Sequence, residues 1–106
     1  MNPGDIIARR ILLAGLVLPL WHFGVLVAPD RVVHMQPGSI VCVRFTAFSR
    51  GMPVIVTHRP PDPAQTIARA KGRIGERGTY DPLHHNCLHF ADWCAQRSRA
   101  SGRVWV

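Results

Sequence analysis

An uninterrupted apolar run near the N-terminus constrains the fold of this chain more than any other feature. From Ile11 to Ala28 the sequence reads ILLAGLVLPLWHFGVLVA, eighteen residues in which His22 is the only polar side chain. That length lies at the lower edge of what a helix needs to cross a bilayer, and Arg9 and Arg10 before the run imitate the start of a signal peptide. The run therefore belongs either to a membrane segment or to the interior of a folded domain.

The residues inside the run favour a strand over a membrane helix. Pro19 weakens a helix, and His22 would place a polar side chain within the bilayer. No A-x-A cleavage motif follows the run, which argues against a signal peptide. We expect the run to break at Leu18–Pro19 and to continue as a strand over residues 22–28.

The composition describes a chain that folds. With 106 residues, 47% hydrophobic and 18% charged, it can build one modest core, so we expect a single domain over residues 1–106. Thirteen Lys+Arg against six Asp+Glu give a net charge of +7, which attracts anionic lipid headgroups or nucleic acid. Because the arginines are scattered and no aromatic-and-basic motif accompanies them, an anionic membrane surface is favoured over nucleic acid as a partner.

Turn signals divide the rest of the chain into short strands and two helices. The turns at Pro29–Asp30, Pro37–Gly38 and Gly51 predict strands over residues 22–28, 31–35, 39–45 and 53–57. Helices are expected over 64–70 and 86–96, and residues 102–106 are a candidate for a last strand. The predicted fold class is α+β, an antiparallel meander packed against the second helix.

Cys87 occupies the position in this second helix that best suits a reactive thiol. Asn86 is a preferred N-cap, so Cys87 falls on the first turn, where free backbone N–H groups and the helix dipole favour a thiolate and can hold an oxyanion. Cys94, seven residues on, lies on the same core-facing stripe and is most simply a buried small hydrophobe. Three cysteines without a disulfide spacing indicate a reducing compartment or a free thiol, consistent with a cytoplasmic or peripheral membrane location. Cys87 is then either a core thiol or a nucleophile.

Two histidines on consecutive predicted strands form a candidate pair. With a loop over residues 28–30, Gly24 lies opposite His34 and His22 occupies the neighbouring diagonal of the same face; a loop centred on Ala28 would oppose the histidines directly. A nucleophile (Cys87) with a base (His22) oriented by a second polar group (His34) is the general form of an activated thiol. The alternative is that one histidine is a core residue and the other lies at a strand end.

Four sequence blocks resemble those of a known family. They are PGDII (3–7), HFGVLVAPDRVVHM (22–35), IARAKGRIGERGTYDPLHHNCLHFADWC (67–94) and SGRV (101–104). The histidine spacing and the Asn-Cys-x-His-Phe block are the most specific parts, although Leu88 stands where an acid is usual. In this order the blocks resemble the lecithin:retinol acyltransferase (LRAT) family, a permuted papain-like form of the NlpC/P60 superfamily.

The resemblance implies a thiol-dependent acyltransferase or acyl hydrolase that takes lipid (phospholipid-type) or other acyl esters and uses no metal or organic cofactor. Cys87 would be the nucleophile that forms a thioester, His22 the base and His34 the orienting third member. Backbone N–H groups of Cys87 and Leu88 are the expected oxyanion hole, with Tyr80 and Asn86 beside the site. Two alternatives stay open. One is an NlpC/P60-like cysteine amidase or peptidase, and the other is a non-catalytic membrane-associated binding protein.

Overall fold

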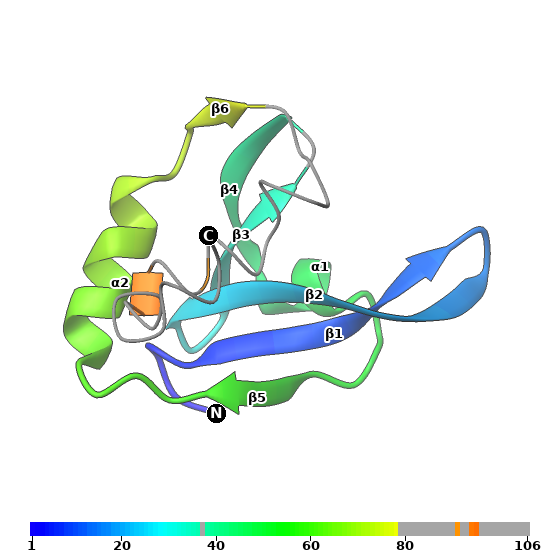
Figure 1. Ribbon diagram of the computed structural model, residues 1–106, viewed down its shortest axis with the longest axis horizontal. Coiled ribbons are helices and arrows are strands. Elements are labelled where there is room, and N and C mark those ends of the chain that lie inside the picture. Colours follow the sequence, from blue (N-terminus) through cyan, green and yellow to red (C-terminus); the bar gives the residue numbers. More distant parts are fainter. Residues whose placement is uncertain (37, 79–90, 92–93, 96–106) are drawn as a thin grey trace, which may run out of the picture.

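In a computed structural model the chain folds around a six-stranded antiparallel sheet, with strand order β5-β1-β2-β3-β4-β6 (Figure 1). The structure describes residues 1–36, 38–78, 91, 94 and 95. The strands are β1 (Ile6–Leu13), β2 (Leu16–Ala28), β3 (Arg31–Gln36), β4 (Gly38–Arg44), β5 (Ile55–His58) and β6 (Arg77–Gly78), and the helices are α1 (Phe45–Ser49) and α2 (Pro63–Gly72). The predicted α+β class with an antiparallel sheet is confirmed.

The apolar run forms most of a β-hairpin. β1 and β2 turn at Ala14–Gly15, where both residues have positive φ, and β2 then continues through Pro19 to Ala28. The predicted break at Leu18–Pro19 is therefore wrong. Among the described residues, no helix is long and apolar enough to cross a membrane.

A β-bulge explains why the proline does not end the strand. Arg10 pairs with Trp21 but Ile11 pairs with Leu18, so the two β2 residues in between, Pro19 and Leu20, have no opposite partner. A residue in a bulge does not need its N–H for the ladder, and proline is tolerated there. The bulge thus absorbs the residue that the sequence pattern presents as a breaker.

The other predicted elements agree closely with the structure. The strands expected over 31–35, 39–45 and 53–57 are β3, β4 and β5, and the helix expected over 64–70 is α2. The Asp62 side chain accepts a 3.1 Å hydrogen bond from the Gln65 N–H, which caps α2. Within the helix expected over 86–96, Ala91, Cys94 and Ala95 are helical, while its other positions and residues 102–106 lie outside the described residues.

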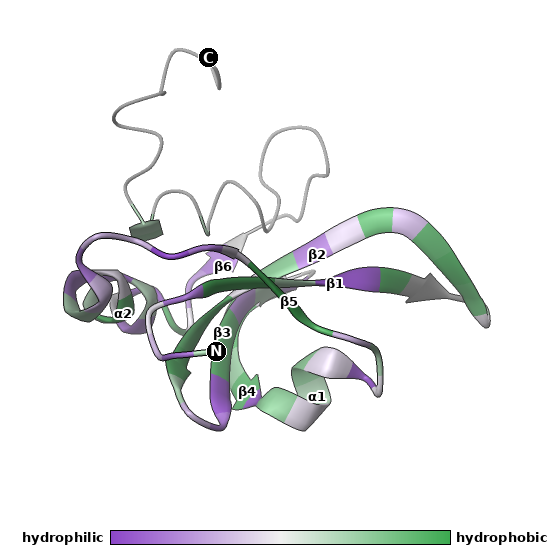
Figure 2. Cartoon of the chain, turned by 90° about the horizontal axis from the view of Figure 1, so that it is seen from below, coloured by the Kyte–Doolittle hydropathy of each residue, from purple (hydrophilic) through white to green (hydrophobic). Residues whose placement is uncertain are grey.

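The two faces of the sheet carry separate apolar clusters. On one face α2 and the helical residues 91, 94 and 95 pack over strand residues in a cluster that comprises Ile6, Val25, Val27, Val33, Ile40, Ala70, Ala91, Cys94 and Ala95. On the other face α1 places Phe48 against Ile7, Leu26 and Val32. Consecutive strand residues point to opposite faces, which is why Val32 and Val33 separate into the two clusters. Figure 2 shows α1 below β1 and β2.

Gly24 on β2 allows the sheet and α1 to approach closely. A Cβ built there would lie 2.7 Å from Val32 Cγ1 and 2.9 Å from Phe48 Cε1. We expect Gly24→Ala to lower the free energy of unfolding by about 1 to 3 kcal/mol, because Phe48 or β3 must move. Urea denaturation measures this loss, with Gly72→Ala as the control because a Cβ there meets no atom within 4 Å. Equal stability of the two variants would contradict the close packing.

Candidate active site

His22 and His34 meet in the interior on the α1 face of the sheet. His22 Nε2 lies 2.7 Å from His34 Nδ1, and the two rings stand edge to face with centroids 4.9 Å apart. Both side chains are 8% exposed. Val25 pairs with Val33, which is the register that sets Gly24 opposite His34. Of the two registers that the sequence left open, the structure has the one with Gly24 opposite His34, although Ala28 pairs with Arg31 and does not belong to the loop. The predicted histidine pair is present.

The Phe48 ring packs against both histidine rings. Its ring centroid lies 5.6 Å from that of His22 and 5.5 Å from that of His34, and its side chain is fully buried. The helix that carries it was not expected, because its N-cap, Arg44, makes no side-chain cap hydrogen bond. Phe48 is thus a site residue that the sequence pattern did not indicate.

Arg9 is a second site residue that the sequence pattern did not indicate. It pairs with His22 across β1 and β2, and its side chain is buried. Its Nε donates to the Phe48 carbonyl, Nη1 donates to the Arg10 carbonyl at 3.0 Å, and the guanidinium lies 5.5 Å from the Phe48 ring centroid. Arg9 therefore ties α1 to the hairpin and places a positive charge beside the histidines.

This environment keeps both histidines neutral at pH 7. Burial is the main cause that lowers the pKa of His22 to about 3, and His34, Arg9 and Arg50 lower it further. Burial likewise lowers the pKa of His34 to about 4, with Arg9 and Arg50 acting in the same direction. Two neutral rings fit the 2.7 Å contact, because one ring nitrogen must donate its hydrogen while the other accepts.

The lowered pKa values predict that acid destabilises the fold. In the unfolded chain these histidines titrate near 6.5, so below that pH the unfolded state takes up protons that the folded state does not. The stability that the fold gains from holding neutral histidines is fully present above pH 6.5. It is lost as the pH falls toward the pKa values of the folded state, about 3 for His22 and about 4 for His34. We expect the free energy of unfolding to fall by about 1.4 kcal/mol per pH unit for each histidine below pH 6.

Urea denaturation at several pH values between 7 and 4.5 measures this slope. A His22→Gln/His34→Gln variant is the control, because it removes both titrating groups from the α1 face and should give a shallower dependence. A wild-type slope no steeper than that of the variant would contradict the buried, neutral state of the pair.

The structure assigns two of the three cysteines to the opposite face. Cys94 is fully buried in the α2-face cluster, its carbonyl accepts a 2.7 Å hydrogen bond from Arg69 Nη1, and burial raises the pKa of its thiol to about 12. It is the core thiol that the sequence predicts. Cys42 is exposed on β4 and pairs with Val33, so it too belongs to the face away from His34.

The remaining predicted site residues are Tyr80, Asn86, Cys87 and Leu88, and all four lie outside the described residues. The structure therefore brings together His22 and His34 of the predicted triad. The described part of the helix expected to carry Cys87 packs on the α2 face, opposite the histidine pair.

Comparison with known proteins identifies the family. The family model for lecithin retinol acyltransferase matches residues 45–99, just over half of the chain. The matched segment contains Cys87 and its Asn-Cys-x-His-Phe block, whereas His22 and His34 precede it. A search of curated proteins finds no match. The extent of the family match shows that the chain belongs to the lecithin retinol acyltransferase family, a family of acyltransferases and thiol hydrolases.

Proposed function

We propose that residues 1–106 form one catalytic domain, a thiol-dependent acyltransferase or acyl hydrolase that acts on phospholipid-type esters. The observation that carries the proposal is the buried 2.7 Å contact between His22 Nε2 and His34 Nδ1, in a chain whose family match includes Cys87. A base oriented by a second polar group is what a thiol nucleophile needs, and these histidines supply both.

The contact fixes which nitrogen would serve as the base. Since Nε2 of His22 faces His34, Nδ1 is the nitrogen left to take a proton from a thiol. In that tautomer His22 donates its Nε2–H to Nδ1 of His34, and His34 carries its own proton on Nε2. His34 thereby orients the His22 ring while the thiol gives up its proton.

The proposed reaction has two acyl-transfer steps. Cys87 transfers its thiol proton to Nδ1 of His22, and the sulfur attacks the ester carbonyl carbon. Backbone N–H groups of Cys87 and Leu88 hold the oxyanion. Collapse expels the alcohol, which takes the proton from His22 and leaves a thioester on Cys87. An amine, an alcohol or water then gives a proton to His22 and attacks the thioester. The sulfur departs, and the proton returns to it.

The positive charges of Arg9 and Arg50 help His34 to accept a hydrogen bond from His22, because they keep His34 neutral. His34 can accept the Nε2–H of His22 only while it is neutral, and burial together with Arg9 and Arg50 keeps it so. The same charges oppose the imidazolium form of His22. An adjacent thiolate would reverse that effect, because an opposite charge within about 4 to 6 Å favours the charged form. We therefore expect His22 to become a cation only as the partner of the Cys87 thiolate.

The proposal requires the Cys87 thiol to reach the α1 face, although Ala91, Cys94 and Ala95 pack on the other face. Disulfide trapping tests this requirement at two adjacent β2 positions, in a Cys42→Ser background. A new thiol from His22→Cys points to the α1 face, and one from Phe23→Cys points to the α2 face. A disulfide forms only when the two Cα atoms approach within about 7 Å with suitable Cβ directions.

We expect oxidation to join the His22→Cys thiol to Cys87, located by mass spectrometry of the linked peptides. The Phe23→Cys thiol serves as the matched control. If Phe23→Cys links to Cys87 and His22→Cys does not, Cys87 belongs to the α2 face and the triad is wrong.

Trapping the acyl-enzyme tests the activity itself. We expect wild-type protein incubated with phosphatidylcholine vesicles to carry a fatty acyl group on the peptide that contains Cys87, and hydroxylamine to remove it. Cleavage of peptide amides without any acyl transfer from lipid would instead identify the NlpC/P60-like amidase alternative.

A further inference from the structure

The hairpin formed by β1 and β2 extends well beyond the sheet. β1 pairs with β5 only over Ile6–Ala8, and β2 pairs with β3 only over Val25–Ala28. Residues 11–21, here called the hairpin arm, pair only within the hairpin in the described sheet: residues 11–13 pair with 16–18, and Trp21 pairs with Arg10. Figure 1 shows the arm projecting past the rest of the molecule, and Figure 2 shows the same from a perpendicular direction.

The arm is apolar in sequence, and large apolar side chains on its β2 strand are exposed, which is unusual for a projecting element. Its sequence, ILLAGLVLPLW, contains no polar or charged side chain. Leu16 is 66% exposed, Val17 60% and Leu20 56%, the three highest exposures among the large apolar side chains of the described residues. Soluble proteins rarely present contiguous apolar surface of this kind unless it meets a partner or a membrane. In Figure 2 most of the coloured arm is green, the colour of hydrophobic residues.

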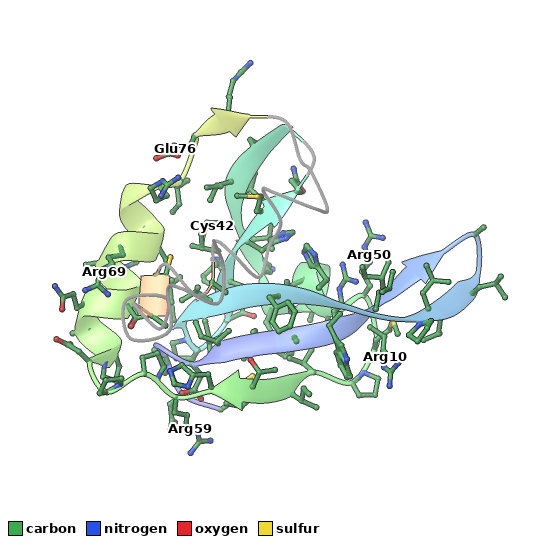
Figure 3. All side chains as sticks on the ribbon, in the orientation of Figure 1. Arg10, Cys42, Arg50, Arg59, Arg69 and Glu76 are labelled. Atoms are coloured by element: carbon green, nitrogen blue, oxygen red, sulfur yellow. The ribbon has the colours of Figure 1, made fainter. Side chains whose placement is uncertain are left out.

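An aromatic and cationic pair marks the base of the arm. The Arg10 guanidinium lies 4.5 Å from the centroid of the Trp21 ring, which is 36% exposed. Figure 3 shows Arg10 and Arg50 on the side of the molecule from which the arm projects. Tryptophan and arginine both combine an apolar body with a polar end, and both concentrate at the boundary between lipid and water. Next to the apolar tip, where the arm joins the sheet, Trp21 and Arg10 are therefore suited to contact lipid headgroups.

We propose that the hairpin arm inserts into the surface of an anionic lipid bilayer, with Leu16, Val17 and Leu20 at the acyl boundary and Trp21 and Arg10 among the headgroups. The net charge of +7 provides the complementary attraction to anionic lipid. A two-stranded arm has open edges whose backbone N–H and C=O groups cannot be satisfied in hydrocarbon. The arm therefore lies in the interfacial region and does not cross the bilayer.

The arm also positions the histidine pair relative to the membrane. His22 follows Trp21 directly on β2, so the pair lies immediately above the headgroup level that Trp21 and Arg10 define. His22 lies five positions after Val17, roughly 17 Å along a strand. The lipid-facing side of the protein is then the side that holds the pair. This link to substrate delivery rests on the proposed function, whereas membrane binding by the arm does not.

Vesicle sedimentation with the full chain carrying Cys87→Ser tests binding separately from catalysis. We expect the protein to bind vesicles of phosphatidylcholine with phosphatidylglycerol more tightly than vesicles of phosphatidylcholine alone. Leu16→Ser/Leu20→Ser should lower the partition coefficient for the anionic vesicles about tenfold or more, because two apolar side chains no longer enter the interface. Ile55→Ser/Ile74→Ser is the control, since these side chains are 45% and 43% exposed and belong to residues outside the arm, and it should bind like the parent.

Quenching by brominated lipid gives a second readout of the same contact. Fluorescence quenching in vesicles that contain brominated phosphatidylcholine should be lost in large part with Trp21→Phe. Equal vesicle binding by the hairpin and control double variants would overturn the proposal. So would a lipid-free oligomer that Leu16→Ser/Leu20→Ser converts to monomer, because the tip would then be an interface between copies of the chain. Neither outcome would affect acyl-enzyme formation on Cys87, which tests the proposed function.

Discussion

Cys87→Ser is expected to lower the rate of fatty acid release from phospholipid vesicles by at least about a thousandfold, as loss of a nucleophile does in enzymes that act through a covalent intermediate. A serine hydroxyl is far less acidic than a thiol, and a histidine pair shaped to receive a thiol proton does not compensate. Release of labelled fatty acid over time measures the rate, and the thioester on Cys87 should disappear with it.

Cys42→Ser is the matched control for this experiment. Its thiol is exposed on β4, on the face away from His34, so the variant should retain the wild-type rate. Undiminished release by Cys87→Ser would show that the activity does not pass through this thiol.

Phe48→Ala is expected to have the largest effect on stability, lowering the free energy of unfolding by about 3 to 5 kcal/mol. The ring is fully buried and contacts both histidines and the guanidinium of Arg9. Its removal leaves a cavity between α1 and the sheet that side chains fixed on strands cannot fill. Because a domain of this size is stable by about 5 to 15 kcal/mol, the loss is large enough to be measured directly by urea denaturation.

Phe45→Ala is the comparison within the same helix, since Phe45 is only half-buried at the edge of the cluster. It should cost clearly less than Phe48→Ala. Phe48→Leu, which keeps most of the apolar volume, allows the measurement even if the alanine variant does not fold. If Phe48→Leu lowers the free energy of unfolding no more than Phe45→Ala does, the role of Phe48 in packing against both histidines is contradicted.

The histidine pair could be predicted because local chemistry determines it. Pro29 and Asp30 specify the turn between β2 and β3, and strand alternation then decides which side chains share a face. These facts left two registers open. The observed one, with Gly24 opposite His34, also depends on a bulge at Val27, because Ala28 and not Val27 pairs with Arg31.

The hairpin arm was predicted incorrectly because an apolar run carries no alternation. Without polar residues to mark one face, neither the period nor the turn can be read from the run, and the sequence pattern predicts a break at Pro19. The turn is at Ala14–Gly15 instead, and the bulge at Pro19 depends on pairing with β1 that no short window of sequence contains.

Phe48 and Arg9 were missed because their roles arise from long-range packing. The Arg9 side chain donates to the carbonyl of Phe48, 39 residues away in the sequence. The helix that carries Phe48, α1, has no side-chain cap that a sequence pattern could indicate. Arg9 looked like one of many scattered surface arginines, although it is buried beside the pair and lowers the pKa of both histidines.

The most direct test of the central claim, that Cys87 and His22 act as a pair, is the rate of Cys87 alkylation by iodoacetamide against pH in the wild type and in His22→Ala. Peptide fragmentation by mass spectrometry separates Cys87 from Cys42 and Cys94. The proposal predicts a thiolate that titrates well below the free-thiol value of about 8.5 and moves upward in the variant. Slow alkylation with the same ordinary titration in both proteins would contradict the pair and leave Cys87 without a catalytic role.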